Sequence, residues 1–235
     1  MVESAPLRFT EVMPRAMWSG SISFGLVNIP VKLYTAVSRK SVRFNQIDAK
    51  SGSRIRYKKV AGESGEEVAN DDIVKGYELP SGDYVTVTDD ELAQLDPKAS
   101  RTIDIEEFVD LVDIDPIYYD SAYYLAPDKA TVKPYALLCR AMEQSGKVGI
   151  ARVVMRTKQY LCAVRPQDGV LLMSTMVYAD EVNAPEQIAE LAEVAEVDVS
   201  DKELTMANQL IESLSEAFDP AKYEDTHRER LLEVI

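Results

Sequence analysis

Hydrophobic residues alternate with small or polar ones along much of the first 180 residues, and this period of two is typical of strands with one buried face. The first such segment is 18–34, in which Ile22, Phe24 and Leu26 alternate with smaller residues. Pro30 interrupts it, and proline has no N–H to donate, so it is expected at the end or edge of a strand. The segment therefore predicts two strands with a kink at Pro30.

The same alternation, enriched in β-branched and aromatic residues, predicts further strands along the chain. They are 42–47 paired with 55–58, then 77–79, 84–87, 100–109, 116–119, 123–127, 148–155, 160–164 and 169–178. Glycines, prolines and acids crowd the stretch 61–82, which predicts a long, loosely built excursion with short strands.

Helical spacing begins with 134–144, where Pro134 suits the first turn and Gly146 suits the stop. A capping box of Thr88 and Glu91 also predicts a short helix that runs to Leu95. From residue 179 onwards the pattern is entirely helical, with an acidic helix at 185–194 and a last helix at 222–235.

The longest predicted helix starts at a second capping box, formed by Ser200 and Glu203, and is ended by Pro220. Its apolar residues recur at three-and-four spacing. They are Leu204, Ala207, Leu210, Ile211, Leu214, Ala217 and Phe218. This stripe either packs on the chain's own core or lies across a second subunit, and the pattern alone leaves both readings open.

Charge is distributed in blocks, although the whole chain carries −14. Residues 39–59 hold eight cations and one acid (+7), and residues 129–165 hold the same numbers. The stretches 60–128 and 166–235 carry −16 and −13. A local patch rather than the net charge decides which ligand is attracted. The two basic blocks could therefore hold a polyanion if folding brings them to one surface.

Within the first block, Arg54, Arg56 and Lys58 alternate with Ile55 and Tyr57. In a strand, this places the three cations on one face and the apolar side chains on the other. A solvated strand edge is the alternative interpretation, because lysine and arginine also discourage aggregation there.

Residue types for catalysis or metal binding are sparse. The one histidine, His227, falls in a polar helix, and Cys139 and Cys162 stand in apolar surroundings, where cysteine packs as a small hydrophobe. Two cysteines are too few for a disulfide framework, and no apolar run approaches the length of a membrane span. We therefore expect a cytoplasmic protein that is not an enzyme, with no cofactor, no metal and no membrane.

Six stretches in chain order carry a more specific signal. They are 15–34 (RAMWSGSISFGLVNIPVKLY), 52–60 (GSRIRYKKV), 100–105 (SRTIDI), 114–119 (IDPIYY), 123–128 (YYLAPD) and 146–152 (GKVGIAR). With these stretches, residues 15–235 resemble the prokaryotic Ku family, the DNA-end-binding proteins of bacterial non-homologous end joining.

The resemblance implies a mixed, β-rich fold like the Ku core, namely a β-barrel with a long bridge excursion and a C-terminal helical arm. Residues 1–14 are then a disordered tail, 15–180 the barrel with its bridge at roughly 39–110, and 181–235 the arm. It also implies a homodimeric ring that threads double-stranded DNA ends and recruits the ATP-dependent end-joining ligase. The expected location is the bacterial nucleoid.

Two features depart from the family pattern. Many members carry Cys-x-x-Cys after the basic strand, where this chain has Ala61 and Ser64, so any zinc site there is lost. Members also commonly continue into a basic tail, whereas this chain stops at Ile235, so recruitment of the ligase through such a tail is not assumed.

Together, the charge blocks and the resemblance name candidate residues. The expected DNA contacts are Arg54, Arg56, Lys58, Lys59, Arg152, Arg156 and Lys158, with Arg43 and Lys75 as second choices. The expected dimer interface is Leu204, Ala207, Leu210, Ile211, Leu214 and Phe218. Contacts from lysine and arginine to phosphates fix position without reading bases, which suits a DNA end of any sequence.

Two other classes of function compete with DNA-end binding. An oligomeric β-rich adaptor could bind an acidic partner through the same basic faces, but it would not distinguish a linear duplex from a closed circle. A hydrolase in the acidic stretch 60–128 would depend on Asp71 or Asp72, for which no motif is present.

Overall fold

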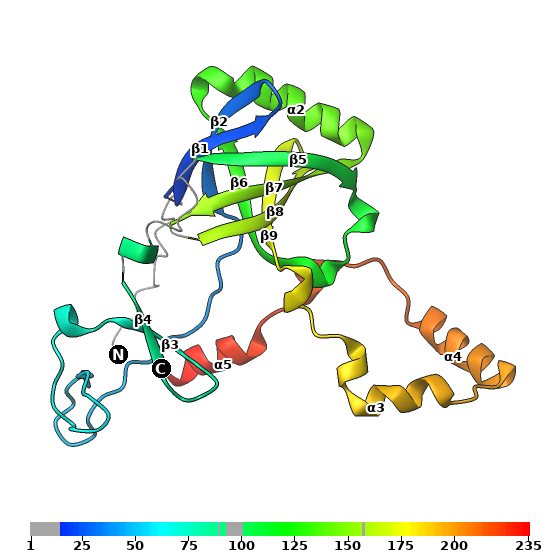
Figure 1. The fold of residues 1–235 in the computed structure, drawn as a ribbon. Coiled ribbons are helices and arrows are strands. Elements are labelled where there is room, and N and C mark those ends of the chain that lie inside the picture. The colour runs from blue at the N-terminus through cyan, green and yellow to red at the C-terminus, as the bar shows by residue number, and fades with distance from the viewer. Residues whose placement is uncertain (1–14, 89, 93–100, 157) are drawn as a thin grey trace, which may run out of the picture.

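Seven strands form a closed barrel in the order β1-β2-β6-β9-β8-β7-β5 (Figure 1). The computed structural model describes residues 15–88, 90–92, 101–156 and 158–235, with the side chains of 195 and 196 left out. The strands are β1 (Trp18–Phe24), β2 (Val27–Thr35), β5 (Thr102–Asp110), β6 (Tyr119–Pro127), β7 (Lys147–Met155), β8 (Lys158–Gln167) and β9 (Val170–Met176). Neighbours are antiparallel except β1 and β5, whose parallel pairing closes the barrel. The predicted β-barrel core is therefore confirmed.

The barrel core consists of the inward-facing residues of these strands, and Ile22, Leu33 and Ile103 are fully buried. Helix α2 (Val132–Ser145) covers one end of the barrel (Figure 1) and joins the same core. It ends at Gly146, whose φ of 66° is the left-handed conformation that glycine adopts without a Cβ penalty. The helix predicted at 134–144 is confirmed.

Pro30 lies inside β2, so the predicted kink is wrong. β2 runs unbroken from Val27 to Thr35, with Pro30 paired opposite Ser21 in β1. The Pro30 carbonyl accepts from the Asp128 N–H at 3.3 Å, just past the last residue pair of β2 and β6. The N–H and C=O of one strand residue point to the same side. The N–H that Pro30 lacks would therefore face β6 beyond the last β2–β6 residue pair, so its absence removes no hydrogen bond from that ladder.

The bridge is the excursion between β2 and β5, and it carries the short hairpin β3 (Lys75–Glu78) and β4 (Tyr84–Val87) and a 3-10 turn at Asn70–Asp72. The predicted ladder of 42–47 with 55–58 is wrong, since a single pair, Ile47 with Arg54, is all that forms there among the described residues. An isolated two-stranded ribbon is marginal in water, and of the two predicted on the bridge only β3–β4 forms a ladder of several pairs.

The other local predictions have mixed outcomes. The capping box of Thr88 and Glu91 forms, with the Glu91 N–H on the Thr88 hydroxyl at 3.2 Å, and the expected end of that helix lies outside the described residues, as do residues 1–14. The strand predicted at 116–119 is wrong, because Pro116–Tyr118 form a 3-10 turn capped by Asp115, whose side chain accepts from the Ile117 N–H at 2.9 Å.

The C-terminal segment extends from the barrel as turns and helices (Figure 1). It contains α3 (Ala189–Ala192), α4 (Asp201–Ser213), α5 (Thr226–Val234) and 3-10 turns at Ala179–Glu181, Pro185–Gln187, Glu193–Glu196 and Pro220–Lys222. The capping box at Ser200 is present. The expected continuous helices at 185–194 and 222–235 are shorter or broken.

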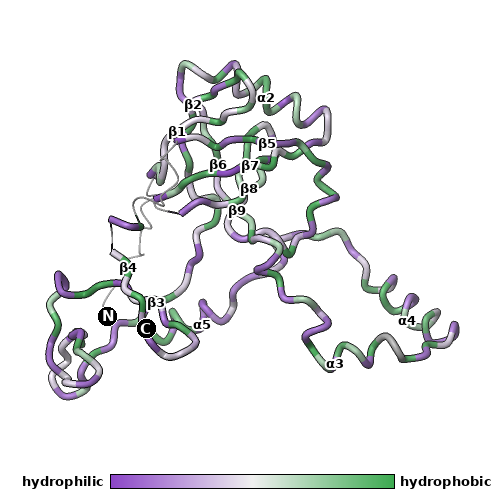
Figure 2. Tube along the Cα trace, viewed as in Figure 1, coloured by the Kyte–Doolittle hydropathy of each residue, from purple (hydrophilic) through white to green (hydrophobic). Residues whose placement is uncertain are grey.

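Helix α4 ends at Ser213, several residues before Pro220, so the prediction that its stripe continues to Phe218 within one helix is wrong. The hydroxyl of Ser213 donates to the Leu210 carbonyl at 2.7 Å, and that of Ser215 donates to the Ile211 carbonyl at 2.8 Å. Serine side chains that bond the backbone compete with helical hydrogen bonds. Hydrophobic positions nevertheless recur along α4, away from the barrel (Figure 2).

The molecule exposes far more surface than a compact monomer. Its accessible surface is 20283 Å², against roughly 10,600 Å² for a compact monomer of this mass. No described residue in 36–92 or 177–235 is buried. The bridge and the arm contribute to this excess, because none of their described residues is buried. No helix in the described ranges has the length and apolarity needed to cross a bilayer.

Both cysteines are buried and unpaired, as expected of small hydrophobes. Burial raises the pKa of Cys162 from 9.0 to about 12, so the folded state binds this proton more tightly than the unfolded chain. The protonated Cys162 thiol contributes to the free energy of unfolding. This contribution is complete below pH 9.0 and is lost as the pH rises toward 12.

We predict that a thiol reagent at about pH 8 labels neither Cys139 nor Cys162 in the native protein and labels both after unfolding, because the thiolate is the reactive species and burial also blocks access. The measurement is absorbance of the released chromophore with and without denaturant. Fast labelling of the native protein would contradict the buried placement.

Candidate nucleic-acid interface

The first basic block, 39–59, lies entirely on the bridge, and a tight turn at its one acid shapes it. The Asp48 carboxylate accepts from the N–H groups of Lys50 and Ser51 at 3.2 and 3.1 Å and from the Ser51 hydroxyl at 2.5 Å. The Ser51 hydroxyl, followed by these N–H groups, holds the pKa of Asp48 below its usual range. Because its oxygens are bonded within the turn, Asp48 does not form an ion pair with any described cation.

Arg54 and Arg56 follow this turn and are exposed. Together with Ser53, Ile55 and Tyr57 they line a hollow of about 820 Å³ on the bridge. Neither arginine makes a hydrogen bond or ion pair with another residue in the described part of the chain. Their charge is therefore open to an external anion.

The neighbouring lysines are already engaged. Lys58 forms an ion pair with Glu67 at 2.6 Å, and Lys59 donates to the Asn70 side chain at 3.1 Å. Lys75 lies at the start of β3, and Arg43 is exposed upstream on the bridge. An exposed ion pair is worth little and opens readily, so Lys58 can exchange Glu67 for a phosphate, although its field is partly neutralised.

The second block is spread over the barrel. Arg152 on β7 pairs with Glu106 on β5 at 2.9 Å, and the Lys158 ammonium lies 5.2 Å from the centre of the Tyr160 ring. Arg156 directly follows β7 and lies in the left-handed region, with φ 61°. Of these three cations, Arg156 is the one without an interaction partner among the described residues.

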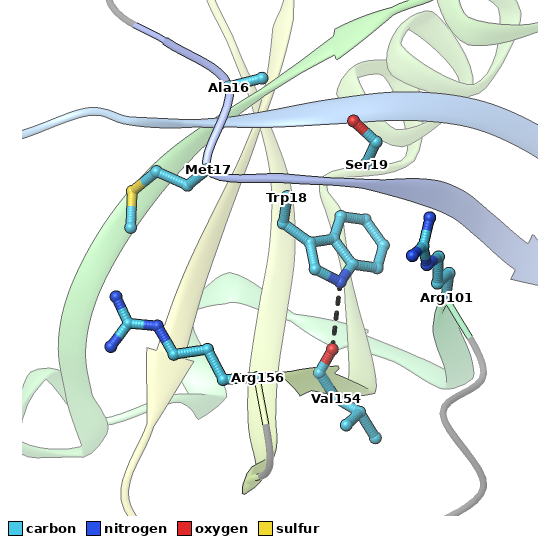
Figure 3. A pocket seen from close by; sticks show the side chains of 7 residues that line it. All are labelled: Ala16, Met17, Trp18, Ser19, Arg101, Val154 and Arg156. Atoms are coloured by element: carbon cyan, nitrogen blue, oxygen red, sulfur yellow. Dashed lines mark hydrogen bonds between the residues drawn. The ribbon is translucent and has the colours of Figure 1, made fainter.

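Folding brings Arg156 to the root of the bridge, where it lines a pocket together with Trp18 and Arg101 (Figure 3). Arg101 immediately precedes β5, at the point where the bridge rejoins the barrel. Sequence reasoning missed Arg101 because it stands in the acidic stretch 60–128 and far from either basic block. The one signal in the sequence that could have found Arg101 is its position in the stretch 100–105, which is among the six that carry the family resemblance.

The expected dimer residues on the arm are all exposed. Leu204, Leu210 and Ile211 on α4 are 53, 66 and 64% exposed. Leu214 caps the helix, and Phe218 beyond it stacks on Tyr223 with ring centres 5.9 Å apart. Of the two readings of this stripe, packing on the chain's own barrel is therefore wrong.

The remaining candidates for chemistry stand apart from one another. His227 is exposed on α5, and Asp71 and Asp72 lie in an exposed 3-10 turn of the bridge. No three His, Cys, Asp or Glu side chains of the described residues gather as a metal site. Ala61 and Ser64 belong to a turn closed by backbone bonds, with the Gly65 N–H on the Ala61 carbonyl at 2.8 Å.

Comparisons with known proteins agree with this architecture. The family model for the "Ku70/Ku80 beta-barrel domain" matches residues 23–206. A "Non-homologous end joining protein Ku" from Anaeromyxobacter sp. (strain K) is 50% identical over 95% of this chain and 75% of that protein. "Non-homologous end joining protein Ku 1" of Saccharopolyspora erythraea is 47% identical over 95% and 68%. The Ku protein of Frankia casuarinae is 46% identical over 94% of this chain and 55% of its own length.

Proposed function

The chain belongs to the Ku family, and from this premise we propose that it binds the ends of double-stranded DNA in non-homologous end joining. The observation that carries the proposal is the bridge, which presents Arg54 and Arg56 without acidic partners among the described residues although the whole chain carries −14. Contacts of this kind recognise the phosphate backbone regardless of sequence.

We further propose that two copies of the chain form a homodimeric ring. A bridge and an arm that bury none of their described residues within the chain support it, because isolated monomers rarely expose such large apolar stretches as the α4 stripe. In the ring, the arms join the two copies through Leu204, Ala207, Leu210, Ile211, Leu214 and Phe218, and the bridges surround the duplex.

The DNA contacts proposed within this ring are the nine residues expected from the sequence, ranked by what each already contacts. Arg54, Arg56, Arg43 and Arg156 come first, because they have no competing partner among the described residues. Lys58, Lys59, Arg152 and Lys158 come second, since each must first leave or share a protein contact. Lys75 belongs to the second group.

The ATP-dependent end-joining ligase is the remaining partner in the proposal, and the protein holds and protects the end while the ligase supplies the catalysis. This part rests on family membership, and bacterial nucleoid DNA is the proposed location.

The competing function is an adaptor that binds an acidic partner through the same cations. A competition gel shift at about 100 mM salt separates the two, since phosphate-dominated binding is still visible there. A labelled linear duplex is challenged with equal masses of linear and covalently closed DNA. We expect only the linear competitor to displace it, because a ring must be threaded from an end.

Equal competition by closed DNA would show that the basic residues form an open patch, and the adaptor would then be the better description. A hydrolase in the bridge would instead show DNA turnover that is lost on substitution of Asp71 or Asp72.

A further inference from the structure

A pocket of about 460 Å³ lies where three distant parts of the chain meet at the root of the bridge (Figure 3). Its wall is formed by the start of β1 with the two residues before it, by the residue before β5, and by the end of β7 with the residue after it. The lining residues are Ala16, Met17, Trp18, Ser19, Arg101, Val154 and Arg156. Among the described lining residues, the two charged side chains are both arginines and none is acidic.

Trp18 is held rigidly in this pocket. Its indole N–H donates to the Val154 carbonyl at 3.1 Å (Figure 3). A Cβ added at Gly20 would lie 2.2 Å from the indole ring and 2.1 Å from the Arg101 carbonyl oxygen. Glycine is therefore required at position 20 for the ring to lie against the strand. The Arg101 backbone is fixed as well, because its carbonyl accepts from the Ser21 N–H at 2.9 Å.

Arg101 and Arg156 flank the indole (Figure 3) and make no ion pair with an acid in the described ranges. By contrast, Arg152 on β7 forms an ion pair with Glu106. A guanidinium that has no acidic partner attracts an anion, and Arg101 and Arg156 each offer one on their own side of the indole (Figure 3). Guanidinium groups match the geometry of phosphate oxygens and can bond them in pairs.

The backbone at Arg156 also indicates a specific role. Its φ of 61° lies in the left-handed region, which is unfavourable for a residue that carries a Cβ. Glycine or asparagine would be the usual residue at such a turn. An arginine there places a charge beside Trp18 at a cost in backbone energy.

We propose that this pocket binds a phosphate group, with Arg101 and Arg156 as its charged sides and Trp18 as its apolar wall. This inference rests on the proposed function for the source of the phosphate, which is then the backbone of a duplex passing the root of the bridge. A free phosphate anion has the same chemistry and is the other possible source.

Trp18 is the only tryptophan of the chain, so its fluorescence reports on this pocket alone. The protein is titrated with linear duplex and, separately, with inorganic phosphate. We expect the duplex to change the Trp18 emission in the wild type and not in the double variant Arg101→Gln/Arg156→Asn. Asparagine is chosen because it tolerates the left-handed conformation. Arg140→Gln on α2, exposed and outside the pocket, is the matched control and should respond like the wild type.

The salt dependence of duplex affinity gives a second readout. Each phosphate contact contributes about 0.9 to the slope of log affinity against log salt. The double variant should lower the slope by about 0.9 if the two arginines share one phosphate, and by about 1.8 if each holds its own. Arg140→Gln should leave the slope unchanged.

The outcomes separate this site from the proposed function. An emission change with inorganic phosphate alone, lost in the double variant, supports the pocket and assigns a free anion as its ligand. If the wild type binds linear duplex but neither ligand changes Trp18 emission and the double variant keeps the wild-type slope, the phosphate pocket is wrong and DNA binding stands. If the wild type binds no duplex, the proposed function fails, and the inorganic phosphate titration still decides on the pocket.

Discussion

Replacing Leu210 and Ile211 together by aspartate is expected to convert a dimer into a monomer at micromolar concentration. Both side chains are about two-thirds exposed in the isolated chain, and burying such a side chain against a second copy contributes about 1.5–3 kcal/mol. Losing both, and burying two charges instead, should raise the Kd of the dimer by about 10³-fold or more. Light scattering gives the mass directly.

The matched control for this experiment is Gln209→Asp, which introduces the same side chain on the opposite face of α4. It should remain dimeric and bind DNA like the wild type. A wild-type protein that is already monomeric at micromolar concentration would contradict the ring, and so would a double variant that stays dimeric. The monomeric variant should also lose its preference for linear over closed DNA, because a single copy cannot encircle a duplex.

Reversing the charge of Arg54 and Arg56 to glutamate is expected to weaken binding to a linear duplex about 100-fold at about 100 mM salt. The reason is the loss of two charged phosphate contacts, each worth about 1.4 kcal/mol, or tenfold in affinity. The slope of log affinity against log salt should fall by about 1.8. Fluorescence anisotropy at several salt concentrations measures both quantities.

The control with an equal change of charge is Lys133→Glu/Arg140→Glu on α2, where both residues are exposed. This control tests whether a more negative net charge is enough to weaken DNA binding. We expect the affinity for the linear duplex to fall less than threefold, because salt at this concentration screens charge interactions beyond about 10 Å. Equal losses in the two variants would show that net charge, and no particular contact on the bridge, governs binding.

A similar reversal at Arg152 should have a smaller effect than reversal at Arg56. Arg152 already pairs with Glu106 at 2.9 Å, and its replacement by glutamate places two acids together on the barrel wall. The sequence ranked the two arginines equally because both stand in basic blocks. Only the pairing of β5 with β7, which aligns Asp104 with Arg152 and bulges next to Glu106, brings the acid within reach of Arg152.

Local features of this protein followed from the sequence because they depend on neighbouring residues. The capping box of Ser200 with Glu203, the glycine stop at Gly146 and the strand alternation of the barrel all involve contacts a few residues apart. The resemblance added the barrel, the bridge and the arm. The prediction for 42–58 was wrong, because among the described residues only Ile47 and Arg54 pair there. The β3–β4 hairpin on the same bridge does form, although its side chains are not buried, so alternation alone does not decide which ribbon pairs.

Long-range contacts were decided only by the tertiary structure. The parallel pairing of β1 with β5 closes the barrel, and this closure carries Arg101 from an acidic stretch to the side of Trp18. The indole there bonds the Val154 carbonyl, 136 positions away. The amphipathic stripe of α4 is visible in the sequence, but its exposure is not. Periodicity records that a face is apolar, whereas what covers that face depends on where the rest of the chain and its partners lie.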